Sequence, residues 1–165
     1  MLSDGLGMAV RGLSPADLML VLGMLLAIRL SSRLGVWAYA VLALPGTLAH
    51  ELAHYLVATL LLAKPQFPSL IPQRTEHGWR LGSVAFRAGW LRSLPIALAP
   101  FALLPLALWW AVTWMAPSVG AVYFAHGWVV AALISASLPS SADFRIALPA
   151  LSLMAIAAIV YALLR

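Results

Sequence analysis

Hydrophobic stretches separated by short polar breaks run along most of the chain. Five of them are long enough to notice, and they cover residues 16–30, 35–63, 91–115, 121–138 and 144–164. A helix needs about 20 mostly apolar residues to cross the hydrocarbon core of a bilayer, so the first stretch either spans as a short helix or enters only part of the way. The pattern predicts an all-α integral membrane protein with about five transmembrane helices.

One polar loop, residues 64–90, interrupts this pattern between the second and third predicted spans. It holds three prolines and five of the fifteen formal charges. Within it, Phe67 to Ile71 and Trp79 to Phe86 have the composition of short strands around a turn at residues 76–78. We therefore expect a small β-hairpin at this point, at the edge of the membrane.

Composition supports the membrane interpretation. Of the 165 residues 64% are hydrophobic and only 9% charged, with a mean hydropathy of +0.98, so a water-soluble domain would have too few polar residues to cover its surface. We interpret residues 1–165 as a single transmembrane domain whose surroundings are the lipid bilayer. The absence of cysteine excludes disulfides and cysteine metal ligands. The basic residues form no run, which argues against a nucleic-acid partner.

The basic residues also predict an orientation, because cytoplasmic loops of membrane proteins are enriched in Lys and Arg. In the five-span arrangement seven basic residues fall on one side and three on the other. This places the N-terminus and the polar loop in the cytoplasm, provided that residues 16–30 span. The seven are Arg11, Lys64, Arg74, Arg80, Arg87, Arg92 and Arg145, and the three are Arg29, Arg33 and Arg165.

The most informative motif lies in the second predicted span, where residues 50–54 read HELAH and match H-E-x-x-H. Two residues four apart lie on one face of a helix, so His50 and His54 can bind the same Zn2+ ion. Glu51 can then deprotonate the water that the metal binds. The alternative is that the three side chains hydrogen-bond neighbouring helices, but ionisable groups inside a membrane usually mark a functional site.

A zinc site needs a third protein ligand, and four residues are candidates. Asp143 lies at the break between the fourth and fifth spans, on the membrane side that the end of the H-E-x-x-H helix reaches. It is our preferred ligand, with a helix N-cap or an ion pair with Arg145 as its other possible role. His126 could bind the metal or stabilise an oxyanion, or be a satisfied core histidine. Glu76 and His77 fit ordinary solvated turn residues better.

An H-E-x-x-H motif in a hydrophobic helix, an aspartate on a later span and a proline-rich polar loop between them resemble the site-2 protease family of intramembrane zinc metalloproteases. The resemblance covers about residues 35–145. It implies that His50, His54 and Asp143 bind zinc, that Glu51 is the general base, and that a substrate segment adds to the loop as an extra strand. The aspartate motif differs from the family's, since Asp143 is followed by Phe144 and not by Gly.

These observations together predict an intramembrane zinc metalloprotease that hydrolyses peptide bonds of membrane-associated proteins or peptides. Its expected location is the inner or plasma membrane, as a multi-pass protein with the active site toward the cytoplasm. Two alternatives use the same histidines. One is a catalytically inactive membrane scaffold, and the other is a protein that handles or transports metal ions.

Overall fold

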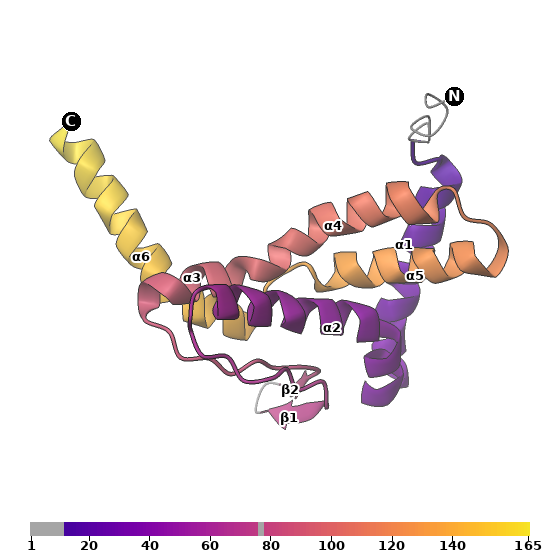
Figure 1. Cartoon of the computed structure of the whole chain (residues 1–165), viewed down its shortest axis with the longest axis horizontal. Helices are drawn as coiled ribbons and strands as arrows, with labels where there is room; N and C mark the ends of the chain where they lie inside the picture. The colour runs from indigo at the N-terminus through magenta and orange to yellow at the C-terminus, as the bar shows by residue number, and fades with distance from the viewer. Residues whose placement is uncertain (1–11, 76–77) are drawn as a thin grey trace, which may run out of the picture.

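The computed structural model describes residues 12–75 and 78–165, and most of them are helical (Figure 1). Most of the expected helices form, and the third expected span is built from several shorter segments in series. The helical elements are α1 (Pro15–Ser31), η1 (Ser32–Leu34), α2 (Val36–Leu60), α3 (Trp90–Leu98), η2 (Ala99–Ala102), α4 (Leu103–Trp110), the π-helical η3 (Ala111–Met115), α5 (Gly120–Ala136) and α6 (Ser141–Leu164).

Three of the helical stretches are long and apolar enough to cross a membrane: Pro15–Leu34, Trp90–Met115 and Ser141–Leu164. They correspond to the first, third and fifth predicted spans. α5 is apolar but has only 17 residues. α2 has 25 residues but is not among these candidate spans. Five spans are therefore not confirmed, and spanning by α2 and α5 stays a prediction.

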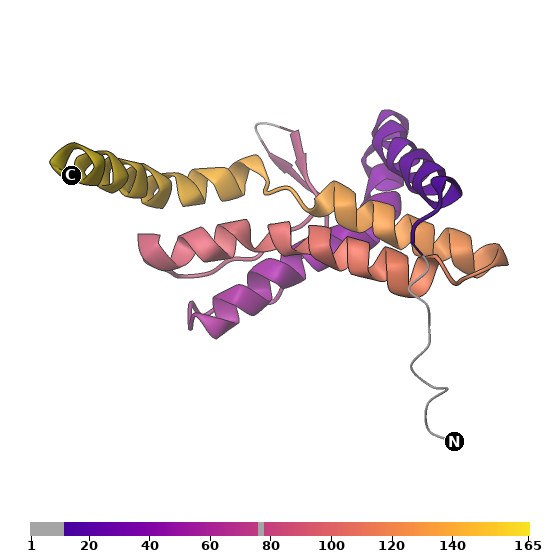
Figure 2. The ribbon, with the colours of Figure 1, turned by 90° about the horizontal axis from the view of Figure 1, so that it is seen from above.

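The helices pack around α5, which contacts α1, α2 and α4 (Figures 1 and 2). The main core cluster lies between these helices and consists largely of alanine, valine and leucine side chains. α3 lies beside α2 and contacts the first turns of α6. All residues of α6 beyond Ala150 are exposed, and both views show the C-terminal part of α6 away from the other helices. An apolar helix with no protein around it is suited to contact with lipid.

Gly46 allows the closest approach between α2 and α5. A Cβ atom built at this position would lie 2.1 Å from the carbonyl oxygen of Ala132 and 2.7 Å from its carbonyl carbon. Those atoms belong to the backbone and cannot move aside without displacing α5. α2 continues as a helix through the preceding Pro45. Gly46 therefore positions the H-E-x-x-H part of α2 against the end of α5.

We expect Gly46→Ala to destabilise the protein by about 1–3 kcal/mol or more, because the added methyl overpacks a backbone contact. The measurement is the thermal unfolding midpoint of the purified protein in detergent. Gly23→Ala is the matched control, since Gly23 also lies inside a helix but has nothing within 4 Å of its Cβ position. It should be neutral or slightly stabilising. Equal midpoints for the two variants would contradict the close approach.

The predicted hairpin forms, but its regular part is displaced toward the turn. β1 (Gln73–Thr75) pairs with β2 (Gly78–Arg80) in antiparallel register, with Arg74 opposite Trp79. The expected strands at 67–71 and 79–86 were wrong in extent. Outside β1 and β2, Ser69 and Ser83 exchange backbone hydrogen bonds at 2.9 and 3.0 Å. Gln66 N–H also donates to the oxygen of Ala85, and Arg87 N–H to that of Ala63, each at 2.8 Å, but no longer regular strand forms. Three prolines on the first arm, which lack an N–H group, explain why no longer ladder forms.

Candidate metal centre

The H-E-x-x-H motif lies on the inner face of α2. The buried residues of α2 are Ala43, Gly46, Glu51, His54 and Ala58, which lie three to five positions apart. This spacing turns one stripe of the helix toward α5 and α3. The side chain of His50, on the same face, is 13% exposed and that of His54 is 6% exposed. Both imidazoles therefore point into the protein and not toward lipid.

Asp143 reaches the same point from the beginning of α6. The helix starts at Ser141, and Ser140 and Asp143 form a capping box. The hydroxyl and the backbone N–H of Ser140 donate to Asp143 Oδ2 at 2.6 and 2.7 Å, and Asp143 N–H donates to Ser140 Oγ at 3.3 Å. The expected helix start at 144 was therefore three residues late. Asp143 has the capping role and also faces the histidines.

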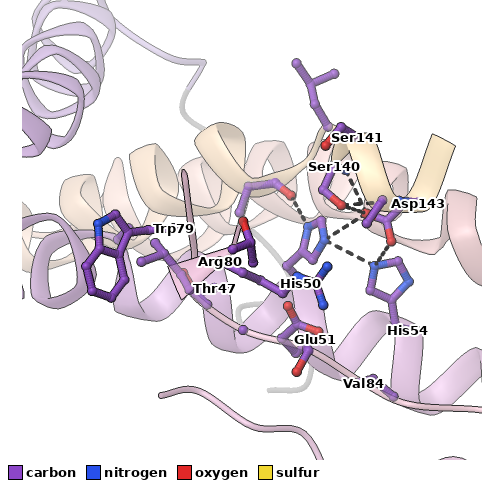
Figure 3. Close-up of a pocket in the computed structure, with 18 of the residues that line it drawn as sticks. Thr47, His50, Glu51, His54, Trp79, Arg80, Val84, Ser140, Ser141 and Asp143 are labelled. Atoms are coloured by element: carbon purple, nitrogen blue, oxygen red, sulfur yellow. Dashed lines mark hydrogen bonds and ion pairs between the residues drawn. The ribbon is translucent and has the colours of Figure 1, made fainter. Parts of the chain in front are cut away.

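The three side chains converge, as Figure 3 shows. Nε2 of His50 and Nε2 of His54 lie 3.1 Å apart. Asp143 Oδ2 lies 3.5 Å from Nε2 of His50, and Asp143 Oδ1 lies 3.2 Å from Nε2 of His54. The group formed by His50, His54 and Asp143 could hold a metal ion.

The other ring nitrogen of each histidine is held by a backbone carbonyl. His50 Nδ1 lies 2.7 Å from the oxygen of Ala136, and His54 Nδ1 lies 2.7 Å from the oxygen of Ile96. A carbonyl can only accept, so both Nδ1 atoms carry a proton. In the neutral imidazole this leaves Nε2 with its lone pair exposed toward Asp143. Such outer hydrogen bonds orient metal-binding histidines in many proteins.

The geometry of these donors fits a tetrahedral metal. When metal–ligand bonds are about 2.0–2.1 Å long, two ligands of a tetrahedral site lie about 3.3 Å apart. The two imidazole nitrogens lie 3.1 Å apart, and each has a different carboxylate oxygen of Asp143 near it, at 3.5 Å for His50 and 3.2 Å for His54, so the three contacts are close to this value. Three facing lone pairs repel one another unless a cation or a shared proton lies between them. Two imidazoles and one carboxylate suit zinc or ferrous iron.

Glu51 lies beside this group and lines the same cavity, which has a volume of about 420 Å³. It is only 6% exposed, and its carboxylate makes no hydrogen bond with the described part of the chain. The loop after β2 passes directly over it. A Cβ atom at Gly82 would lie 2.7 Å from Oε1 of Glu51, so only glycine leaves room for the carboxylate in this position.

The remaining candidates lie elsewhere or fall outside the structure. His126 does not belong to the metal-binding group, because its Nδ1 accepts a hydrogen bond of 3.1 Å from Trp110 Nε1 between α4 and α5. This is the satisfied core role that the sequence left open. Glu76 and His77 lie outside the described residues. Arg145 forms no ion pair with Asp143 among the residues that the structure covers.

Several groups that form the site were not predicted from the sequence. The capping box has a visible signature, S-x-x-D at residues 140–143, that could have been read as a helix start. The sequence gives a weaker indication for the carbonyl of Ile96, because the residue four positions later is a proline and cannot donate to it. No pattern in the sequence indicated that the carbonyl of Ala136 or the backbone of Gly82 would meet α2.

No family model, no curated protein and no solved structure matches the chain. A function for the chain therefore has to be inferred from the geometry of the site.

Proposed function

We propose that the chain is a zinc-dependent peptidase that cleaves membrane-associated proteins or peptides, with His50, His54 and Asp143 as the zinc ligands. The observation that carries the proposal is the convergence of two imidazole nitrogens and the Asp143 carboxylate, with contacts of 3.1 to 3.5 Å, beside the carboxylate of Glu51, which makes no hydrogen bond with the described residues. Ferrous iron would fit the donors equally well, but the adjacent Glu51 gives hydrolysis a base. The site would lie in a multi-pass protein of the inner or plasma membrane, toward the cytoplasm.

Zinc bound here would make a water molecule acidic enough to ionise near neutral pH and would polarise the peptide carbonyl. The protein's own part in the reaction falls to Glu51. It would take the proton from the water and deliver it to the amine that leaves when the peptide bond breaks. Its burial under Gly82 limits access of bulk water to the carboxylate, and the lack of hydrogen bonds leaves both oxygens able to accept that proton.

The loop beside Glu51 offers a place for an extended substrate. Ser83 directs its backbone groups toward Ser69, so the adjacent residues Gly82 and Val84 direct theirs to the opposite edge. Both residues line the cavity, and neither has a backbone partner there among the described residues. A peptide that added as a strand along this edge would run past the metal-binding group.

The proposal is tested by incubating the purified full-length protein in detergent with a pool of membrane-spanning peptides and analysing the products by mass spectrometry. We expect cleavage that a zinc chelator abolishes and added zinc restores. The absence of both stoichiometric zinc and cleavage would favour the inactive scaffold. Metal flux into vesicles that is lost in His50→Ala would favour the metal-handling alternative.

We expect Gly82→Ala to lower the rate of cleavage by about 100-fold, because the new methyl must displace the Glu51 carboxylate and small misplacements of a catalytic group have effects of this size. The displaced atoms belong to a flexible side chain, so the thermal unfolding midpoint and the zinc content should stay near those of the wild type. Gly89→Ala is a suitable control, since nothing lies within 4 Å of its Cβ position. A Gly82→Ala protein with wild-type activity would contradict the placement of Glu51.

A further inference from the structure

The carbonyl of Ile96 lacks the usual hydrogen-bond donor of an α-helix. In an α-helix this oxygen would accept from the N–H of the residue four positions later. That residue is Pro100, which has no N–H. α3 ends here and continues as η2, in which the N–H of Ala99 bonds to the Ile96 oxygen. A carbonyl oxygen can accept two hydrogen bonds, so one position stays open.

The open position is taken by the metal-binding motif. Nδ1 of His54 lies 2.7 Å from the Ile96 oxygen, and the two residues are 42 positions apart in the chain. The surroundings are closed, since Ile96 is fully buried and His54 is 5% exposed. Water therefore has little opportunity to replace the carbonyl. This bond determines which nitrogen of His54 faces Asp143.

We propose that Pro100 is a positioning residue of the metal centre. Pro100 has no N–H to donate to the Ile96 carbonyl, so that oxygen can accept a hydrogen bond from Nδ1 of His54. This bond turns the Nε2 lone pair of His54 toward Asp143. An N–H at position 100 would compete for the same oxygen and free the imidazole to rotate or change tautomer. Pro100 contacts neither the metal nor the substrate, so it acts only through His54.

The same span contains two further prolines, Pro95 and Pro105, which do not act in this way. Their counterparts four residues earlier are Leu91 and Phe101, and the carbonyls of these residues accept no side-chain hydrogen bond from the described chain. Any of the three prolines could produce a kink in this span. The hydrogen bond to His54 singles out Pro100.

The test compares Pro100→Ala with Pro105→Ala in the full-length protein in detergent. The first readout is the tautomer of His54 in the metal-free protein, from ¹⁵N NMR of labelled histidine. We expect the Nδ1–H form to dominate in the wild type and in Pro105→Ala, and the Nε2–H form to appear in Pro100→Ala. The second readout is zinc affinity, which rests on the proposed function. It should fall by about 10–100-fold in Pro100→Ala only.

A third protein separates the missing N–H from the packing of the proline ring. It carries the α-hydroxy analogue of alanine at position 100, which has the alanine side chain but an ester oxygen in place of the N–H. We expect it to keep the wild-type tautomer and zinc affinity. The proposal is overturned if this protein loses either one, or if Pro100→Ala keeps the wild-type tautomer. Should Pro100→Ala fail to fold, the ester protein alone decides by the same criterion.

The two readouts also separate this inference from the proposed function. If the wild type binds no zinc, the peptidase proposal fails, but the tautomer comparison still decides whether Pro100 orients His54. If zinc binds and the tautomer is the same in all three variants, the positioning role fails and the peptidase proposal stands.

Discussion

Glu51→Gln is expected to lower peptide cleavage by about 100- to 10,000-fold, the usual contribution of a general base. Glutamine has nearly the same size and shape as glutamate but cannot accept the proton from water. It should fit under Gly82 as the glutamate does. The measurement is the initial rate of product formation, with the zinc content of each preparation determined in parallel.

The zinc content is the control that separates loss of the general base from loss of the metal. Glu51 lies beside His50, His54 and Asp143 but is not one of the converging donors. The Glu51→Gln protein should therefore bind zinc in the wild-type amount. Full activity in a zinc-loaded Glu51→Gln protein would exclude Glu51 as the base. Loss of zinc together with activity would mean that Glu51 helps to hold the metal.

Asp143→Ala is expected to weaken zinc binding by more than the roughly 100-fold that loss of an outer-shell partner produces, because a direct ligand disappears. Activity should disappear with the metal. The substitution also removes one half of the capping box with Ser140, at a cost of about 1 kcal/mol in stability. Competition with a fluorescent zinc chelator measures the affinity, and thermal unfolding measures the stability.

Asp17→Ala is a matched control for this substitution, since the chain contains a second capping box of the same design. Asp17 and Ser14 cap α1 as Asp143 and Ser140 cap α6. Asp17 also accepts a hydrogen bond of 2.7 Å from Tyr123 Oη, so its loss should destabilise the protein at least as much. Zinc affinity should nevertheless stay unchanged. An equal loss of affinity in both variants would mean that Asp143 acts only through stability.

Local sequence patterns predicted much of the candidate site because its central motif is local. Two histidines four residues apart on a helix must share a face, and ionisable side chains in a hydrophobic helix usually mark a functional site. The hydrophobic stretches likewise placed the long helices to within a few residues. Here the preferences of single residues and the spacing of apolar positions agree.

The remaining features depend on contacts between segments far apart in the chain. The start of α6 was misplaced because Phe144 begins the apolar run, whereas the helix begins where Ser140 can cap it. The hairpin was misplaced because apolar composition does not determine strand register. The carbonyls of Ile96 and Ala136 come to the histidines only because α3 and α5 end beside α2.

The central claim is that His50, His54 and Asp143 together hold one zinc ion. X-ray absorption spectroscopy of the purified, metal-loaded protein, with the metal content determined by elemental analysis, tests it most directly. We predict one zinc per chain, bound by two imidazole nitrogens and at least one oxygen at about 2.0–2.2 Å, with the zinc lost in the His50→Ala, His54→Ala double variant. A protein that takes up no stoichiometric metal, or that keeps its zinc without both histidines, would contradict the account.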